Sequence, residues 1–184
     1  MVRKEKGSYL LNDQHIEVYV FIGEFQAHMN MKMARESDPC AIVIWENLDE
    51  FIMETPNPVI KNKFYATGHR LLGQYGIPLI TDNQFHYFHS PYKNDLRLED
   101  LCLHVFTINP LSIRAIIYVS LAIIKNKSKW DWKYLEFESR TYQLDDMARR
   151  LRIYIESKGK VRSRGFPSWN ELKDKAEGYD IYEI

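Results

Sequence analysis

The sequence predicts an α+β fold, with a small N-terminal antiparallel sheet and hairpin followed by a C-terminal helical layer. Short runs rich in β-branched and aromatic residues dominate the first half. From Asp95 onward, apolar residues recur with helical spacing. Within that half, the stretch 110–125 is apolar on almost every side and suits a buried central helix, because no face of it prefers water. We therefore divide the chain into a strand-rich α+β region, 1–94, and a helical region, 95–184, which could form one integrated domain.

The composition and the N-terminus narrow the class of protein. Apolar residues make up 45% of the 184 residues, which is enough for a packed core and argues against a disordered chain. Basic and acidic residues number 25 each, and this zero net charge argues against a strongly basic nucleic-acid-binding protein. The N-terminus lacks the apolar core of a signal peptide, so we expect a cytoplasmic protein that does not bind membranes.

The first third of the chain is expected to supply three strands. Residues 15–22 are rich in β-branched and aromatic side chains, and residues 25–33 alternate more weakly. Residues 41–45 form a short apolar run, and the turn signal Ser37–Pro39 precedes it. Gly23 would mark a bend between the first two strands. We expect the three to pair as a small antiparallel sheet.

Two helices are expected to follow these strands. The first begins at Asn47 and is broken by Pro56, because proline cannot continue a helix. The second begins at Pro58, with Asn57 as its N-cap, and ends at Gly76.

A β-hairpin and a series of helices complete the chain. Residues 77–81 and 84–89 are expected to pair around a two-residue turn. Asn109 and Pro110 suit the N-cap and first position of the central helix, which Asn126 ends. The other helices are expected near residues 98–105, 130–140 and 145–157, and from the capping box Ser168–Glu171 onward.

The residues able to carry catalysis or bind metals form no recognised motif. The sequence contains no G-x-S-x-G, no phosphate-binding glycine loop and no H-E-x-x-H. His86 and His89 are three apart on an expected strand, so their side chains point to opposite faces. Cys40 and Cys102 fit no zinc spacing and are expected to be buried free thiols. We therefore expect no catalytic residue, no cofactor and no metal.

One enzyme alternative stays open. A metal-dependent nuclease would place acidic residues and a lysine on adjacent strands, and Glu17, Glu24 and Lys32 could be arranged in this way. Glu99 and Asp100 instead fit the first turn of a helix, where the helix dipole favours negative charge.

A basic loop is the most specific candidate site. Lys158, Lys160, Arg162 and Arg164 place four positive charges within seven residues, in a loop that also contains glycine and serine. Such a cluster could neutralise phosphates, with an affinity that falls steeply as salt rises. The alternative is a solvated loop between two helices. Further candidate contacts for a nucleic acid or a protein partner are Arg149, Arg152 and the aromatic Trp130.

Several motifs follow one another from residue 65 to the C-terminus. They are Tyr65-Ala-Thr-Gly68, Gly76-Ile-Pro78, Phe88-His-Ser-Pro91, Leu96–His104, Asp131-Trp-x-Tyr134-Leu135, Gly165-Phe-Pro-Ser-Trp169 and Ala176-x-x-Tyr179. In this order they resemble the AbiEi-type antitoxin and transcriptional-regulator family, whose members are partners of nucleotidyltransferase toxins in type IV toxin–antitoxin systems. These motifs are packing and capping patterns, so the resemblance implies no catalytic residue.

The resemblance sets our expectation of function. Many members of that family carry an N-terminal winged-helix DNA-binding domain, whereas the first 55 residues here are predicted as strands without a helix-turn-helix. The resemblance therefore implies the non-catalytic, protein-binding half. We expect a non-enzymatic intracellular regulatory protein, similar to an antitoxin, that docks on a protein partner such as a nucleotidyltransferase-like toxin. A nucleic-acid-binding module that uses the loop 158–164 is the alternative, and the oligomeric state is left open.

Overall fold

The computed structural model describes the backbone of residues 2–5 and 8–11, and residues 16–59, 64–89, 96–110, 112–161, 163–182 and 184 with their side chains. Strands β1 (Val2–Glu5) and β2 (Ser8–Leu11) form an antiparallel hairpin ahead of helix α1 (Ile16–Ser37). The first half continues with β3 (Ile42–Asn47), β4 (Glu50–Thr55), β5 (Phe64–Thr67), the 3-10 helix η2 (His69–Tyr75) and β6 (Gln84–His89). The second half consists of α2 (Leu98–Ile108), α3 (Ile113–Lys125), the short η3 (Lys127–Lys129), α4 (Trp132–Glu138), α5 (Asp145–Glu156) and α6 (Trp169–Glu177).

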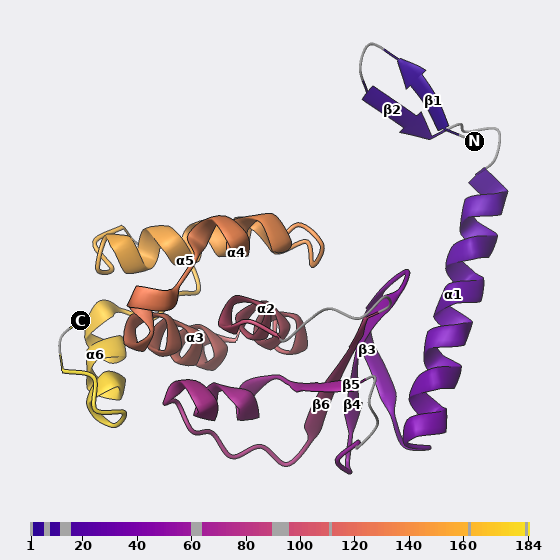
Figure 1. The fold of residues 1–184 in the computed structure, drawn as a ribbon. Coiled ribbons are helices and arrows are strands. Elements are labelled where there is room, and N and C mark those ends of the chain that lie inside the picture. Colours follow the sequence, from indigo (N-terminus) through magenta and orange to yellow (C-terminus); the bar gives the residue numbers. More distant parts are fainter. Residues whose placement is uncertain are drawn as a thin grey trace.

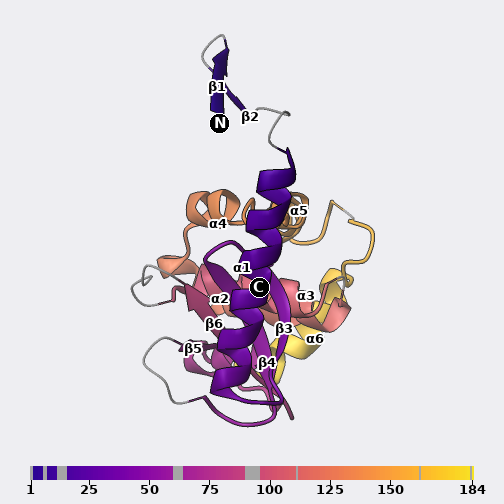
Figure 2. The ribbon, with the colours of Figure 1, turned by 90° about the vertical axis from the view of Figure 1, so that its right-hand side faces the viewer.

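The α+β class is confirmed, with an antiparallel sheet in the first half and a helical layer in the second (Figure 1). The four-stranded sheet has the order β3-β4-β6-β5, and every neighbouring pair is antiparallel. Figures 1 and 2 show α1 on one side of this sheet and the other helices on the opposite side. Side chains alternate between the two faces of a strand. Phe51 and Met53 therefore pack with Ala34 of α1, whereas Ile52 packs with Leu103 of α2.

Helix α3 is the predicted central helix and fills the core of the helical layer. Ala115, Ile116 and Val119 are buried in a cluster with side chains of α2, α5 and α6. The helix begins later than expected: Oγ of Ser112 accepts a hydrogen bond from the backbone N–H of Ala115 and so caps it. Asn109 is instead the C-cap of the preceding helix α2, so its predicted role as the N-cap of the central helix was wrong.

Helix α1 replaces two of the predicted strands. Residues 15–22 and 25–33 were expected to be extended, but the chain is helical from Ile16 to Ser37, and Gly23 lies inside the helix. β-branched residues favour strands only weakly, and tertiary packing overrides that preference. Asn30 supplies part of this packing, since its Nδ2 donates to the carbonyl oxygen of Leu48 at 3.2 Å in the turn after β3. The predicted strand at 41–45 is confirmed as β3.

The helix predicted at Asn47 is a strand. A turn at Leu48 and Asp49 joins β3 to β4, with Leu48 at a φ of 42°. In β4, Phe51 and Ile52 point to opposite faces of the sheet, as neighbouring residues of a strand do. Cross-strand pairing thus overrode the helical signal at Asn47.

The predicted second helix and hairpin are also different. The described part of residues 58–75 contains β5 and η2 in place of one long helix, while residues 60–63 lie outside the described residues. Gly76 does end η2 in the left-handed conformation, as predicted, with a φ of 83°. Of the expected hairpin, residues 84–89 form β6, but its partners are β4 and β5 and not residues 77–81.

The remaining helices follow the predicted pattern. Helix α5 buries Met147, Leu151 and Tyr154, as its apolar stripe indicated. The predicted capping box of α6 is present: Oγ of Ser168 accepts from the backbone N–H of Glu171 at 3.2 Å, and Oε2 of Glu171 accepts from the backbone N–H of Ser168 at 2.7 Å. These helices obey local signals, which is why the sequence predicts them well.

Candidate functional site

The basic loop follows α5 and is exposed. Lys158, Lys160 and Arg164 all face solvent, and Arg162 lies outside the described residues. Lys158 and Gly159 both adopt a positive φ, of 53° and 69°, which turns the chain sharply away from the helix. The loop therefore presents the predicted lysines and Arg164 on an accessible turn.

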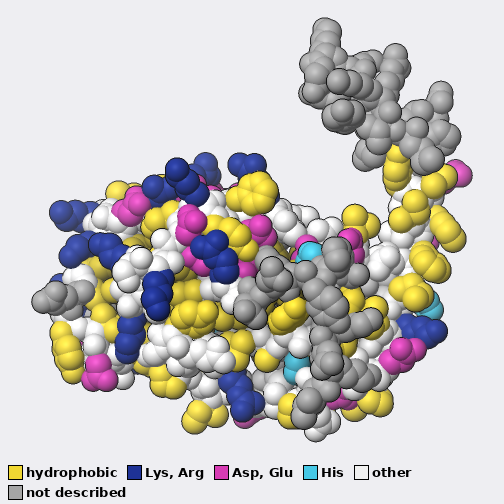
Figure 3. All heavy atoms as spheres, in the orientation of Figure 1, with side chains coloured by type: hydrophobic (Ala, Val, Ile, Leu, Met, Phe, Trp, Pro, Cys, Tyr) yellow, Lys and Arg dark blue, Asp and Glu magenta, His cyan; other side chains and the backbone are white. Residues whose placement is uncertain are grey.

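The arginines of α5 add less positive charge to this loop than expected. Arg149 donates to Oδ1 of Asp146 at 2.6 Å. Arg152 donates to Glu136 and to Glu156, at 2.9 Å each, and these carboxylates raise the pKa of its guanidinium. In Figure 3, Lys and Arg side chains gather over the helical half with acidic side chains among them. Arg149 and Arg152 thus belong to ion pairs on the helix surface, and the cluster of positive charge is narrower than predicted.

An apolar groove of about 570 Å³ lies beside the loop, among α3, α5, α6 and the segment before α4. Two predicted contacts from different parts of the chain, Trp130 and Lys158, meet in its lining. Lys127 and Lys158 are exposed. The groove is lined by Ile123, Ile124, Lys127, Trp130, Trp132, Ile155, Glu156, Lys158, Trp169 and Ile184.

Three tryptophans line the groove. The rings of Trp130 and Trp132 meet edge to face, with their centroids 5.3 Å apart. Nε1 of Trp130 is buried, and no hydrogen-bond partner for it is found in the described part of the chain. Trp169 reaches the groove from α6 and packs edge to face on Tyr154, at 5.3 Å. Large, rigid aromatic surface flanked by lysines is typical of a binding site more than of a packed core.

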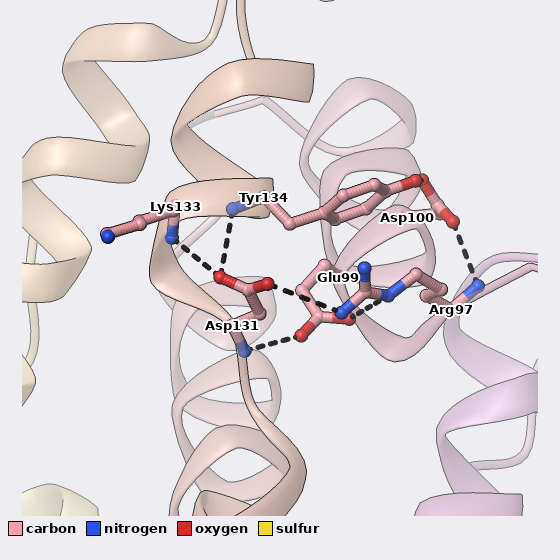
Figure 4. A network of polar contacts seen from close by, with 6 residues as sticks. All are labelled: Arg97, Glu99, Asp100, Asp131, Lys133 and Tyr134. Atoms are coloured by element: carbon pink, nitrogen blue, oxygen red, sulfur yellow. Dashed lines mark hydrogen bonds and ion pairs between the residues drawn. The ribbon is translucent and has the colours of Figure 1, made fainter.

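A polar network around two buried carboxylates, Glu99 and Asp100, connects to the tryptophan pair (Figure 4). Asp131 lies between the two tryptophans, and its backbone N–H donates to Oε1 of the buried Glu99 at 2.7 Å. Its own carboxylate caps α4 by accepting from the backbone N–H groups of Lys133 and Tyr134. The start of α4 is therefore tied both to its own first turn and to α2.

The same network holds the first turn of α2. Arg97 forms an ion pair with Glu99, with Nε and Oε2 3.4 Å apart, and its guanidinium lies 4.0 Å from the centroid of the Tyr134 ring. The buried Asp100 accepts from the hydroxyl of Tyr134 at 2.9 Å and from the backbone N–H of Arg97 at 2.8 Å. The prediction that Glu99 and Asp100 are acids of a helix N-terminus is confirmed. Each buried carboxylate has partners, as buried charge requires.

Two buried histidines also have structural partners. His104 is fully buried between Thr67 and Tyr142, with ring nitrogens 2.6 Å and 2.8 Å from their hydroxyl oxygens. Nε2 of His86 accepts from the backbone N–H of Val59 at 3.1 Å, and burial lowers the pKa of His86. In the described residues, no three His, Cys, Asp or Glu side chains come close enough to share a metal ion.

Two further predictions about reactive residues were wrong. Glu17, Glu24 and Lys32 all lie on α1, so they cannot occupy adjacent strands as a nuclease site would require. Cys40 is exposed because it follows the turn at Asp38, whose Oδ1 accepts from its backbone N–H at 2.8 Å. Cys102 is buried as predicted, and burial raises its pKa well above the usual value.

The sequence alone indicated only part of the groove. Trp130 and Lys158 were predicted contacts, whereas Lys127 and Trp169 were not. Residues 127, 158 and 169 are far apart in the sequence and lie in η3, after α5 and in α6. Sequence spacing therefore could not predict that they line the same groove.

A comparison with models of protein families matches most of this chain to one family. A family model described as HVO_2833_C, C-terminal, matches residues 61–181. The searches of curated proteins and of solved structures returned no match. The helices of the described chain include none with the length and apolar character to cross a membrane. The matched region contains the basic loop and every lining residue of the groove except Ile184. It exceeds half of the chain, so the chain belongs to the HVO_2833_C family.

Proposed function

We propose that this protein is a non-enzymatic intracellular regulator, similar to an antitoxin, that docks on a protein partner through the groove lined by Trp130, Trp132 and Trp169. One observation carries the proposal. Two tryptophans at the start of α4 and a third on α6 converge on one open apolar groove. Residues with this chemistry are enriched where protein partners bind, because they supply large apolar area at low entropic cost.

The charges around the groove suit an apolar segment with acidic residues. Lys127 and Lys158 line it, with Lys160 and Arg164 in the adjoining loop. Among the described residues of the lining, Glu156 is the one acidic side chain. Rim charges steer association and set specificity more than affinity. The partner segment would therefore bury apolar side chains between the tryptophans and place carboxylates near the lysines.

The resemblance to AbiEi-type antitoxins supplies the class of partner. It implies a nucleotidyltransferase-like toxin, and the fold supports a binding role by placing the groove on well-packed helices. Residues 130–132 are held by the polar network of Figure 4, so the groove is preorganised, which lowers the cost of binding.

The test is capture of the partner from the native cells by the tagged full-length chain, with and without nuclease, read by mass spectrometry. We expect one stoichiometric nucleotidyltransferase-like protein that survives nuclease treatment. The variant Trp132→Arg should reduce recovery of this protein at least tenfold. It replaces an aromatic lining residue by a charged one, which disfavours burial of apolar side chains of the partner. Lys158→Glu with Arg164→Glu should weaken capture less and make the loss depend on salt.

A control variant separates an effect of the groove from a general effect of added charge on α4, and circular dichroism checks that both variants are folded. Phe137 is an exposed aromatic residue on the same helix as Trp132 and does not line the groove. Phe137→Arg should therefore leave capture unchanged. Equal losses in Phe137→Arg and Trp132→Arg, or no loss in either, would remove the groove from the interface.

A nucleic-acid-binding module is the second candidate function, and the same groove favours it. Tryptophan surfaces beside lysines suit the stacking of single-stranded bases. In that case the tagged chain would capture only nucleic acid, and nuclease treatment would abolish the capture. Lys158→Glu with Arg164→Glu would reduce the salt dependence of nucleic-acid binding. That result would replace the protein partner with a nucleic acid.

A further inference from the structure

A second pocket lies between the sheet and the helical layer, apart from the groove lined by the tryptophans. Its volume is about 450 Å³, and its lining comes from β3, β4 and β6, from residues 79–83, from η2, from the end of α2 and from the first half of α3. All of its lining residues belong to the described part of the chain, and none of them lines the groove. The pocket has the size of a small-molecule site and can be tested independently of the groove.

Phe85 of β6 lies in the middle of the pocket wall that the sheet provides. Glu54 of β4 pairs with Phe85 on one side, and Thr67 of β5 pairs with it on the other. His69 follows two residues after Thr67, at the start of η2, and lines the pocket with Glu54 and Phe85. Neighbouring strands are about 4.8 Å apart, so Glu54 and the β5 side are separated by roughly 10 Å across Phe85.

Arg114 supplies positive charge on the His69 side of the pocket. Its guanidinium lies 5.5 Å from the centroid of the Tyr118 ring, a cation–π contact that orients it. Burial and the charge of Arg114 both lower the pKa of His69, so His69 is uncharged at neutral pH. Arg114 is then the one cation among the described lining residues, and it forms no ion pair within the part of the chain that the structure describes. The first turn of α3 adds the positive potential of a helix N-terminus beside it.

Negative charge gathers on the opposite side of the same pocket. Asn83 donates to Oε1 of Glu54, and its neighbour Asp82 also lines the pocket. A ligand with only negative charge would be repelled by these two acids, and a ligand with only positive charge would be repelled by Arg114. A molecule with a carboxylate at one end and an ammonium at the other suits both sides, because a guanidinium binds a carboxylate through two parallel hydrogen bonds.

We propose that this pocket binds a small zwitterion, whose carboxylate contacts Arg114, whose ammonium contacts Glu54 and whose apolar middle covers Phe85. Ile44 and Ile108 add apolar surface to the lining, which suits a ligand with an apolar spacer between its charges. The separation across Phe85 requires the two charges to lie at opposite ends of the ligand. An ω-amino acid, or a short peptide with free termini, has this chemistry.

The experiment is an NMR titration of the full-length chain with three matched compounds: 6-aminohexanoate, hexanoate and hexylamine. The zwitterion should bind about fivefold more tightly than either singly charged compound, because it makes one more charge pair in a partly exposed site. Arg114→Gln should remove the advantage of 6-aminohexanoate over hexylamine. Glu54→Gln should reduce its advantage over hexanoate, so the two variants assign the two ends of the ligand.

The control removes a neighbouring charge that does not line the pocket. Arg70 is exposed and follows His69, so Arg70→Gln should leave the binding of all three compounds unchanged. Circular dichroism checks that every variant is folded. No change in the spectrum with 6-aminohexanoate, equal binding of the three compounds to the wild type, or the same loss in Arg70→Gln as in Arg114→Gln would each overturn the proposal. The comparison of the three compounds on the wild type does not depend on any variant.

Discussion

At the scale of single residues, Gly159 shows how one position shapes the basic loop. It has a φ of 69°, and a Cβ built on it would lie 2.7 Å from Cβ of Trp169. Both the backbone conformation and the closeness of Trp169 therefore require glycine. The contact places the start of the loop directly on a tryptophan of the groove, so the two parts of the candidate site are structurally linked.

Replacing Gly159 by alanine should destabilise the protein by about 2–5 kcal/mol, since left-handed strain of about 1–2 kcal/mol adds to overpacking of about 1–3 kcal/mol. Gly165 is the matched control: its φ is 86°, but nothing lies within 4 Å of a Cβ built there. Gly165→Ala should cost only the strain. Urea unfolding of both variants measures the difference, and a Gly165→Ala loss as large as that of Gly159→Ala would contradict the role of Trp169.

At the scale of elements, the short helix α4 depends on its first residues. A helix of this length is marginal by itself, and Asp131 supplies its N-cap by accepting from two backbone N–H groups at 3.0 Å and 3.1 Å. Asp131 also connects α4 to α2 through Glu99. The cap therefore stabilises both the helix and the tryptophans on either side of it.

Asp131→Ala should lower the free energy of unfolding by about 1 kcal/mol, through loss of the cap. Asp131→Asn keeps an acceptor oxygen at the cap and loses only the ion pair with Arg97, in which Nη2 and Oδ2 are 3.7 Å apart and half-exposed. Such a pair contributes little, so Asp131→Asn should be close to wild type. Thermal unfolding distinguishes the two, and equal losses would mean that the ion pair matters more than the cap.

At the scale of the whole molecule, the sheet and the helical layer share buried side chains. Ile52 and Tyr87 from the sheet pack with Leu103 of α2 and Leu135 of α4 in one cluster. The ring of Trp45 on β3 lies 4.5 Å from that of Tyr142, between their centroids. Since these contacts join the two regions, we expect them to unfold together.

Leu103→Ala should cost about 2–5 kcal/mol, because it removes buried apolar contacts and leaves a cavity. Variants that retain Trp45 or Trp169 as the single tryptophan report on the sheet and on α6 separately. Both signals should shift to the same lower urea midpoint in Leu103→Ala, while the exposed Phe137→Ala should shift neither. Two separate transitions would show that the regions unfold independently.

The helical half could be predicted from the sequence because its signals are local. The apolar stripe of α5 and the capping box at Ser168 each act within a few residues, and both are present as expected. The N-terminal half could be predicted only in part, since β3 and β6 were expected as strands but α1 was not expected as a helix. Residues 16–37 contain a β-branched run that favours a strand locally, yet they form a helix anchored by Asn30 and Ala34.

The sequence by itself determined the α+β class, the central helix and the position of the basic loop. Only the tertiary structure decided which side chains become a site: it neutralised Arg149 and Arg152 with carboxylates and assembled the groove from Trp130, Lys158 and Trp169. The physical reason is the separation along the chain between the residues that interact. Helix caps and apolar stripes depend on neighbours along the chain, whereas ion pairs, grooves and the exposed face of α1 depend on contacts between residues far apart in sequence.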